Sequence, residues 1–150
     1  MFNDSSASNE NKTPILLHPR KRAELLEKGM ALFNNELFFE AHEEWERLWL
    51  LEQGRDRLFI QGLIQVAGHL VHVQKGQWSG AMGLLKLARE KLLAPIGVSN
   101  PHYKALDIEP LLAALDYNEE LLLKVNPTTP PPVAGAFLVP KLFLHHAGDF

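Results

Sequence analysis

Residues 38–49 read Phe-Phe-Glu-Ala-His-Glu-Glu-Trp-Glu-Arg-Leu-Trp, and residues 61–65 read Gln-Gly-Leu-Ile-Gln. In the first stretch, apolar side chains recur at three- and four-residue spacing, which is typical of an amphipathic helix. In the second stretch, two glutamines stand one helical turn apart within a largely apolar segment. Buried polar groups cost free energy unless they meet partners. Two neighbouring helices with such polar stripes therefore predict a shared internal polar site.

Five helices are predicted when the same periodicity is followed outward from these stretches. Their approximate ranges are 19–34, 36–51, 55–75, 77–93 and a fifth that begins near 107. Asn34-Asn35 is expected to form the first turn, because asparagine tolerates a left-handed backbone. Asp107 is expected to cap the fifth helix, with Pro110 in its first turn.

The predicted fold is an all-α, compact antiparallel bundle, because no segment outside the tail alternates with a period of two and the connections are short. The first four helices resemble two copies of one hairpin, offset by 40 residues. In this alignment Phe33 matches Val73, and Ala41 matches Ala81. The fifth helix is expected to cap the two hairpins. The residues expected in the core are Trp45, Trp49, Leu63, Ile64, Leu85 and Ala88.

Three segments are predicted along the chain: a flexible N-terminal arm (1–18), the helical bundle (19–125) and a Pro-rich tail (126–150). The prolines between 127 and 132 favour an extended chain. Large apolar side chains follow them, such as Phe137 and Leu142, and each would cost roughly 1.5 kcal/mol or more if left in water. We therefore expect the tail to dock, either on its own bundle or on a neighbouring copy in a tail-exchanged homodimer.

The composition excludes several classes of function. The chain has 150 residues, 46% of them hydrophobic, and a net charge of −3, so it lacks the basic excess of a nucleic-acid-binding surface. The absence of cysteine excludes disulfides and thiolate metal sites. Apolar runs are shorter than the ~20 residues that span a membrane, and the polar N-terminal arm is unlike a signal peptide. We therefore expect a cytoplasmic protein.

The polar stripes can be placed on helical wheels at ~100° per residue. His42 and Glu46 fall between aromatic side chains, and Glu43 lies at the edge of that sector. On the following helix, one stripe holds the two glutamines and two histidines. Its ends are about 16 Å apart at ~1.5 Å per residue, so a compact site would use neighbouring turns only. The candidate binding residues are His42, Glu46, Gln61, Gln65 and His72.

Three interpretations of these residues stay open. The first is a buried hydrogen-bond network that fixes the register of the helices, and the second is a pocket for a small molecule or a protein partner. The third is a metal-dependent hydrolase, because His42-Glu43-x-x-Glu46 differs by one residue from the H-E-x-x-H zinc motif. In that case Glu43 would be the general base. The candidate metal ligands are His42, Glu46, His69 and His72. A structural, ligand-binding or partner-binding module is the leading hypothesis. No cofactor is predicted for it, and a divalent metal ion belongs to the hydrolase alternative.

These stretches resemble the domain-of-unknown-function family 309, whose members are small all-helical prokaryotic proteins. The matching residues are Phe33-Asn34, Phe38 to Glu43, Glu46, Trp49, Gln61 to Gln65, His72, Gly76 and Gly80-Ala81. The resemblance covers about residues 23–93. Asn35 and Gln77 depart from the pattern in two turns, and His69 lies outside it. The resemblance implies a helical-bundle fold and assigns no activity, substrate or partner.

Overall fold

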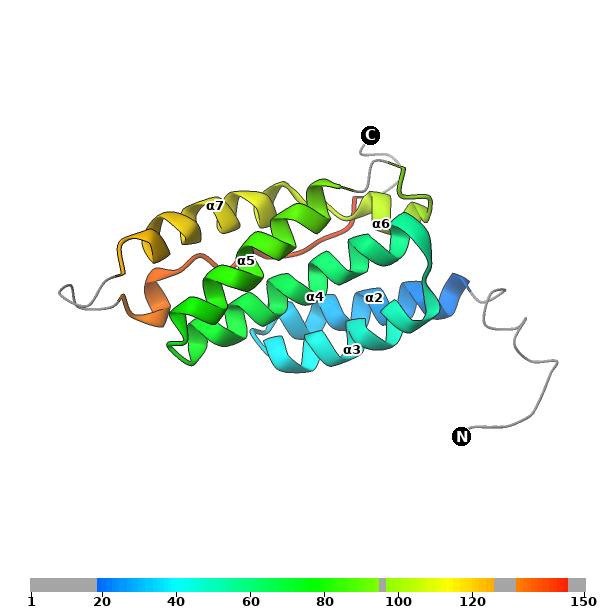
Figure 1. Cartoon of the computed structure of the whole chain (residues 1–150). Coiled ribbons are helices and arrows are strands. Elements are labelled where there is room, and N and C mark those ends of the chain that lie inside the picture. The colour runs from blue at the N-terminus through cyan, green and yellow to red at the C-terminus, as the bar shows by residue number, and fades with distance from the viewer. Residues whose placement is uncertain (1–18, 95–96, 126–131, 146–150) are drawn as a thin grey trace.

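The computed structural model describes residues 19–94, 97–125 and 132–145. These residues form six α-helices and no strand, so the predicted all-α fold is confirmed (Figure 1). The predicted N-terminal arm (1–18) and residues 126–131 and 146–150 of the predicted Pro-rich tail lie outside the described residues. The helices are α2 (Pro19–Asn34), α3 (Phe38–Leu51), α4 (Gly54–Gln74), α5 (Trp78–Leu93), α6 (Pro101–Ala105) and α7 (Glu109–Leu123), followed by one 3-10 turn, η2 (Ala134–Ala136).

The short helix α6 is a difference from the predicted count of five. It begins where the Asn100 side chain accepts a hydrogen bond from the His102 amide at 2.9 Å, with Pro101 in the first helical position. Five residues are too few to show a helical period in the sequence. The predicted cap of the next helix also differs by one position. Ile108 occupies the N-cap of α7, while the Asp107 side chain accepts from the Glu109 amide at 3.0 Å.

The two helical hairpins, α2–α3 and α4–α5, share one turn geometry. The Leu37 amide donates to the Leu32 carbonyl at 2.9 Å, and the Gln77 amide donates to the His72 carbonyl at the same distance. In each turn the preceding residue has a positive φ, which is +62° at Glu36 and +68° at Gly76. The two turns are therefore equivalent at an offset of 40 residues.

The left-handed position was expected at Asn34-Asn35, and this expectation is wrong. Helix α2 continues through Asn34, and the Asn35 side chain donates to the Ala31 carbonyl at 3.0 Å. The residue that reverses the chain lies just beyond the helix, as in other helix C-terminal caps. That residue is Glu36, which lacks the conformational freedom of the glycine at the equivalent position 76.

Helix α4 lies between α3 and α5, and α7 packs on the outer side of α5 (Figure 1). The Arg89 guanidinium of α5 bonds to the Asp116 and Glu119 carboxylates of α7 at 3.0 and 2.8 Å. Of the six residues expected in the core, four are fully buried and two, Trp49 and Ile64, are half-buried against it. Because α4 packs on α3, a polar site that includes the stripe of α3 would lie between these two helices.

The close packing of α2 on α3 depends on one glycine. A Cβ atom at Gly29 would lie 2.1 Å from Nε1 of Trp45. The indole is fully buried, and its Nε1 donates to the Leu26 carbonyl at 3.2 Å. Forty residues further on, His69 takes the place of Gly29 and Leu85 takes the place of Trp45. The second hairpin therefore has two side chains of similar size where the first pairs a glycine with a tryptophan.

The tail residues 132–145 lie against the bundle of their own chain. Phe137 and Leu142 are only 5% and 3% exposed, and the Phe137 ring stacks on Trp78 with centroids 5.6 Å apart. From η2 the tail runs back antiparallel to α7, toward α6 (Figure 1). The described part of the tail is therefore an element of the core.

We predict that Glu36→Gly stabilises the protein by about 1 kcal/mol, because a left-handed backbone costs a residue with a Cβ atom roughly 1–2 kcal/mol. Gly76→Glu, the reverse exchange at the equivalent turn, should destabilise it by a similar amount. Urea denaturation followed by circular dichroism measures both changes. If Glu36→Gly lowers the free energy of unfolding, the equivalence of the two turns is wrong.

Candidate functional site

His42 and Glu46 of α3 form a pair within their own helix. His42 Nε2 lies 3.3 Å from Glu46 Oε2, the i to i+4 spacing expected of a helical pair. The Phe39 ring stacks on the His42 imidazole with centroids 5.9 Å apart. Glu43 is exposed. The histidine therefore sits between an aromatic ring and a carboxylate at the edge of the helix.

The contact that joins α3 to α4 on this side is made by Trp49 and Arg57. The guanidinium carbon of Arg57 lies 3.7 Å from the centroid of the indole ring, which is a cation–π contact. The two helices are consecutive and antiparallel. His42 lies seven residues before Trp49 on α3, and Gln65 lies eight residues after Arg57 on α4. These separations correspond to about 11 and 12 Å along the two helix axes. His42 and Gln65 therefore lie at nearly the same level of the bundle.

The α3–α4 strip, which we define as His42, Trp49, Arg57 and Gln65, carries unsatisfied polar atoms. Six buried side-chain atoms have no hydrogen-bond partner among the described residues, and two of them, Arg22 Nε and Glu44 Oε1, lie outside the strip. The four within it are His42 Nδ1, Trp49 Nε1, Arg57 Nε and Gln65 Oε1. Among the described residues, no hydrogen bond joins His42 or Glu46 to Gln61 or Gln65. The cross-helix bond that we expected is therefore not made, and the shared polar site stays a prediction.

His72 faces the start of α5 instead of α3. Its Nδ1 lies 2.6 Å from Oε1 of Gln77. A Cβ atom at Gly80 would lie 2.8 Å from the same nitrogen, so the imidazole covers that glycine. His72 therefore supports the α4–α5 turn.

His69 is fully buried among α4, α5 and α7. Its Nδ1 lies 2.8 Å from the Ala81 carbonyl, which can only accept, so Nδ1 carries the proton. Its Nε2 then accepts from Asn118 Nδ2 at 3.1 Å. Burial lowers the pKa of His69 from its ordinary value, which favours this neutral form. Both ring nitrogens are thus used within the protein.

The residues proposed as metal ligands are divided among different contacts. His69 bonds to α5 and α7, whereas His42 and Glu46 pair on α3. Within the described ranges, no group of three or more His, Asp or Glu side chains is arranged to hold a metal ion. The metal-dependent hydrolase therefore stays a prediction that no described arrangement of side chains favours.

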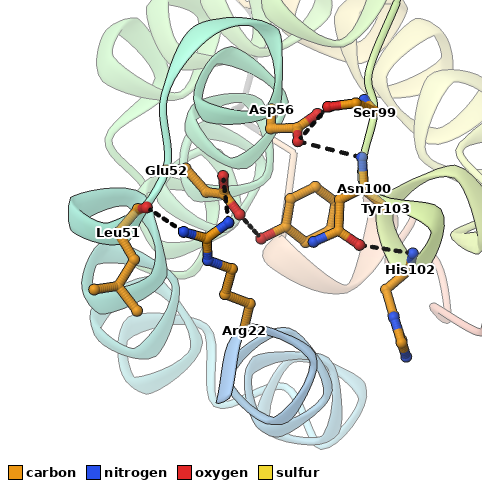
Figure 2. A network of polar contacts seen from close by, with 8 residues as sticks. All are labelled: Arg22, Leu51, Glu52, Asp56, Ser99, Asn100, His102 and Tyr103. Atoms are coloured by element: carbon orange, nitrogen blue, oxygen red, sulfur yellow. Dashed lines mark hydrogen bonds and ion pairs between the residues drawn. The ribbon is translucent and has the colours of Figure 1, made fainter. Parts of the chain in front are cut away.

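Sequence analysis missed a buried polar network where α3 meets α4 (Figure 2). Glu52, only 5% exposed, accepts a hydrogen bond from the Tyr103 hydroxyl. The Arg22 guanidinium lies 3.7 Å from the other Glu52 oxygen and donates to the Leu51 carbonyl at 3.2 Å. Burial raises the pKa of Glu52, although the bond from Tyr103 and the charge of Arg22 oppose this change. Burial also raises the pKa of Tyr103.

Asp56 extends the same network to the loop before α6. Its carboxylate accepts from the Ser99 amide at 2.7 Å, the Ser99 hydroxyl at 3.0 Å and the Asn100 amide at 3.2 Å. These bonds hold α6 where the Tyr103 ring stacks on Phe59, with centroids 5.8 Å apart. The sequence gives no periodic signal for this network, because its members stand in connections and first turns.

A hollow of about 300 Å³ adjoins this network, lined mostly by apolar residues that include Phe59, Val98 and Tyr103. Glu52 is not part of its lining, and the Tyr103 hydroxyl is bonded to Glu52. The network therefore fixes the positions of α2, α4 and α6, and neither of its carboxylates, Glu52 and Asp56, belongs to the lining of the hollow.

Residues 26–84 match the family described as domain of unknown function (DUF309). The chain resembles this family. No curated protein and no solved structure matches the chain. The DUF309 match contains the whole α3–α4 strip and ends before Tyr103, Asn118 and the tail. None of the helices in the described chain is long and apolar enough to cross a membrane.

We predict that acid weakens the fold through His69. Its folded-state pKa lies below the ordinary 6.5, so below about pH 6.5 the unfolded chain takes up a proton that the folded chain does not. The free energy of unfolding should fall as the pH decreases from this point. In His69→Gln this dependence should be absent, as measured by urea denaturation between pH 5 and 8.

The comparison with the variant is needed because Glu52 acts in the opposite direction. Its folded-state pKa is raised above 4.5, so its contribution to stability is full below that pH and declines as the pH rises through the folded-state value. The difference between wild type and His69→Gln isolates the histidine. Parallel pH curves for the two proteins would contradict the prediction.

We predict that Tyr103→Phe lowers the free energy of unfolding by about 1–3 kcal/mol, the usual cost of leaving a buried polar partner unsatisfied. The unsatisfied group would be the Glu52 carboxyl. Tyr117→Phe on α7 is the matched control, because Tyr117 is 48% exposed and such changes cost less than about 0.5 kcal/mol. Equal effects of the two substitutions would show that the network adds no stability.

Proposed function

We propose that the DUF309-like region is a binding module whose α3–α4 strip contacts a ligand or a protein partner. The observation that supports this proposal is a set of four buried polar atoms, on two adjacent helices, that have no hydrogen-bond partner within the part of the chain that the structure describes. Native proteins leave few buried polar groups unsatisfied, and each costs about 1–3 kcal/mol. A chain that keeps four in one strip gives up stability that a bound partner would restore.

The chemistry of the strip limits what it can bind. Trp49 Nε1 and Arg57 Nε are donors, Gln65 Oε1 is an acceptor, and His42 Nδ1 can be either. A complementary partner offers both donors and acceptors, as peptide groups or a small polar molecule do. The net charge of −3 argues against a nucleic acid.

Exposed apolar side chains beside the strip favour a protein partner. Phe39 and Leu50 are 55% and 71% exposed. They are eleven residues apart and therefore lie on one side of α3 at ~100° per residue. Phe39 also stacks on His42, at the edge of the strip. We further propose that this binding occurs in the cytoplasm, in keeping with a sequence that has no cysteine.

The test is the sign of a stability change. We predict that Gln65→Leu raises the free energy of unfolding by about 1–2 kcal/mol, because it replaces a half-buried amide, whose oxygen is buried and unsatisfied among the described residues, with an apolar side chain. Asn118→Leu is the matched control, since the Asn118 amide is fully hydrogen-bonded, and it should lower stability. If both substitutions lower it, the strip is a structural network and the proposal fails.

A further inference from the structure

The tail is bound chiefly through its main chain. The Asn118 side chain donates to the Leu138 carbonyl at 3.1 Å and accepts from the Leu138 amide at 2.7 Å. Four residues further on, the Asn34 side chain donates to the Leu142 carbonyl at 2.9 Å and accepts from the Leu142 amide at 2.8 Å. Each asparagine thus pairs with both peptide groups of one tail residue, as a neighbouring strand would.

Two more main-chain bonds hold the end of the tail beside α6. The Asp107 amide donates to the Phe143 carbonyl at 3.3 Å, and the His145 amide donates to the Ala105 carbonyl at 2.8 Å. The tail side chains also contribute here, since Lys141 Nζ donates to the Asn34 carbonyl at 2.6 Å and His145 Nε2 lies 3.5 Å from an Asp107 carboxylate oxygen. The six bonds described above, however, use only main-chain atoms of the tail. Any extended segment could make them.

The side chains of the tail add two anchors and leave a gap. Phe137 and Leu142 are buried, whereas Leu138 and Phe143 are 45% and 46% exposed. Beneath η2 is a hollow of about 340 Å³. Its lining includes Phe38, Leu70 and Val73 of the bundle and Ala134 and Gly135 of the tail. The tail therefore places its smallest residues over an apolar hollow that it does not fill.

We infer that this surface, the tail groove, is a binding site for an extended peptide segment of a partner protein, and that the tail occupies it in the absence of that partner. The groove is the surface of Asn34, Phe38, Leu70, Val73, Trp78 and Asn118. Binding of extended segments through main-chain bonds, with pockets for a few side chains, is a recurrent mode of peptide recognition.

The partner segment is defined by what the groove offers. It carries apolar residues at the positions of Phe137 and Leu142, and a large apolar residue in place of Ala134 or Gly135. A Cβ atom at Gly135 would have nothing within 4 Å, so a longer side chain can be added there. Because the tail is part of the same chain, it competes for the groove at an effective concentration on the order of millimolar. A partner segment that fills the hollow gains the additional affinity needed to displace the tail.

The experiment uses full-length chains and a labelled peptide of residues 132–145. Fluorescence anisotropy compares wild type with Phe137→Ala/Leu142→Ala, in which the tail has lost both anchors. The peptide should bind this variant at least ~10-fold more tightly than wild type. A peptide with Gly135→Leu should bind about 10-fold more tightly again, and one with Gly135→Ala should not, because burying a leucine side chain is worth more than one power of ten.

A matched pair of groove variants tests the asparagine contacts. In the background with weakened anchors, Asn34→Leu should reduce peptide affinity by about tenfold, since it removes two hydrogen bonds. Asn35→Leu should leave affinity unchanged, because the neighbouring Asn35 side-chain amide bonds to the Ala31 carbonyl of α2 and, among the described residues, to no part of the tail. Leu142→Ala alone serves if the double variant does not fold, as judged by circular dichroism.

Several outcomes would overturn the inference. They are equal peptide affinity for wild type and the folded variant, equal binding of a scrambled peptide, and no preference for Gly135→Leu over the native sequence. A wild-type dimer in light scattering that the double substitution dissociates would show that a second copy's tail is the occupant. That result would also overturn the assignment to a partner protein.

Discussion

The contact between the His69 ring and the Asn118 amide is the interaction on which the rest of the structure depends. His69 is bonded to α5 through the Ala81 carbonyl, and Asn118 connects it to α7 and to Leu138 of the tail. Four parts of the chain thus meet in a short series of hydrogen bonds at the centre of the protein. The His69 ring can accept from Asn118 only when it is neutral, so this series of hydrogen bonds requires a neutral His69. Such a network fixes a single arrangement of helices that apolar packing alone would leave less defined.

The same position shows how the two hairpins differ. In the first hairpin, Gly29 gives room for the Trp45 ring, so α2 and α3 pack closely through an aromatic group. In the second, His69 and Leu85 fill the equivalent space, and the histidine brings the polar atoms that α7 and the tail require. A repeat of similar backbones therefore serves two purposes: the first copy forms apolar contacts, and the second copy organises the C-terminal half of the chain.

Periodicity predicted what depends on local sequence. The all-α fold and the approximate helix ranges of α2 to α5 followed from apolar spacing, and Trp45 and Leu85, both expected in the core, are fully buried. Contacts between distant residues were not accessible in this way. Asn118 is a polar residue in a leucine-rich helix, and Tyr103 lies between the fourth and fifth predicted helices, so neither has a periodic signal. Glu36 was missed because its backbone is set by the end of a helix and not by its own preference. The polar stripes were located, but periodicity could not tell which side chains bond to each other.

The hydrogen bonds between Asn34 and the tail affect the order in which parts of the protein fold. Asn34 is the last residue of α2, and its carbonyl accepts from Lys141 Nζ at 2.6 Å while its side chain holds Leu142. In the sequence, Lys141 is 107 positions and Leu142 is 108 positions away from Asn34. On the ribosome, α2 and α3 can pair early because they are close in the chain, but the end of α2 is completed only after residue 142 has left the exit tunnel. The first hairpin to be synthesised is therefore among the last to be finished.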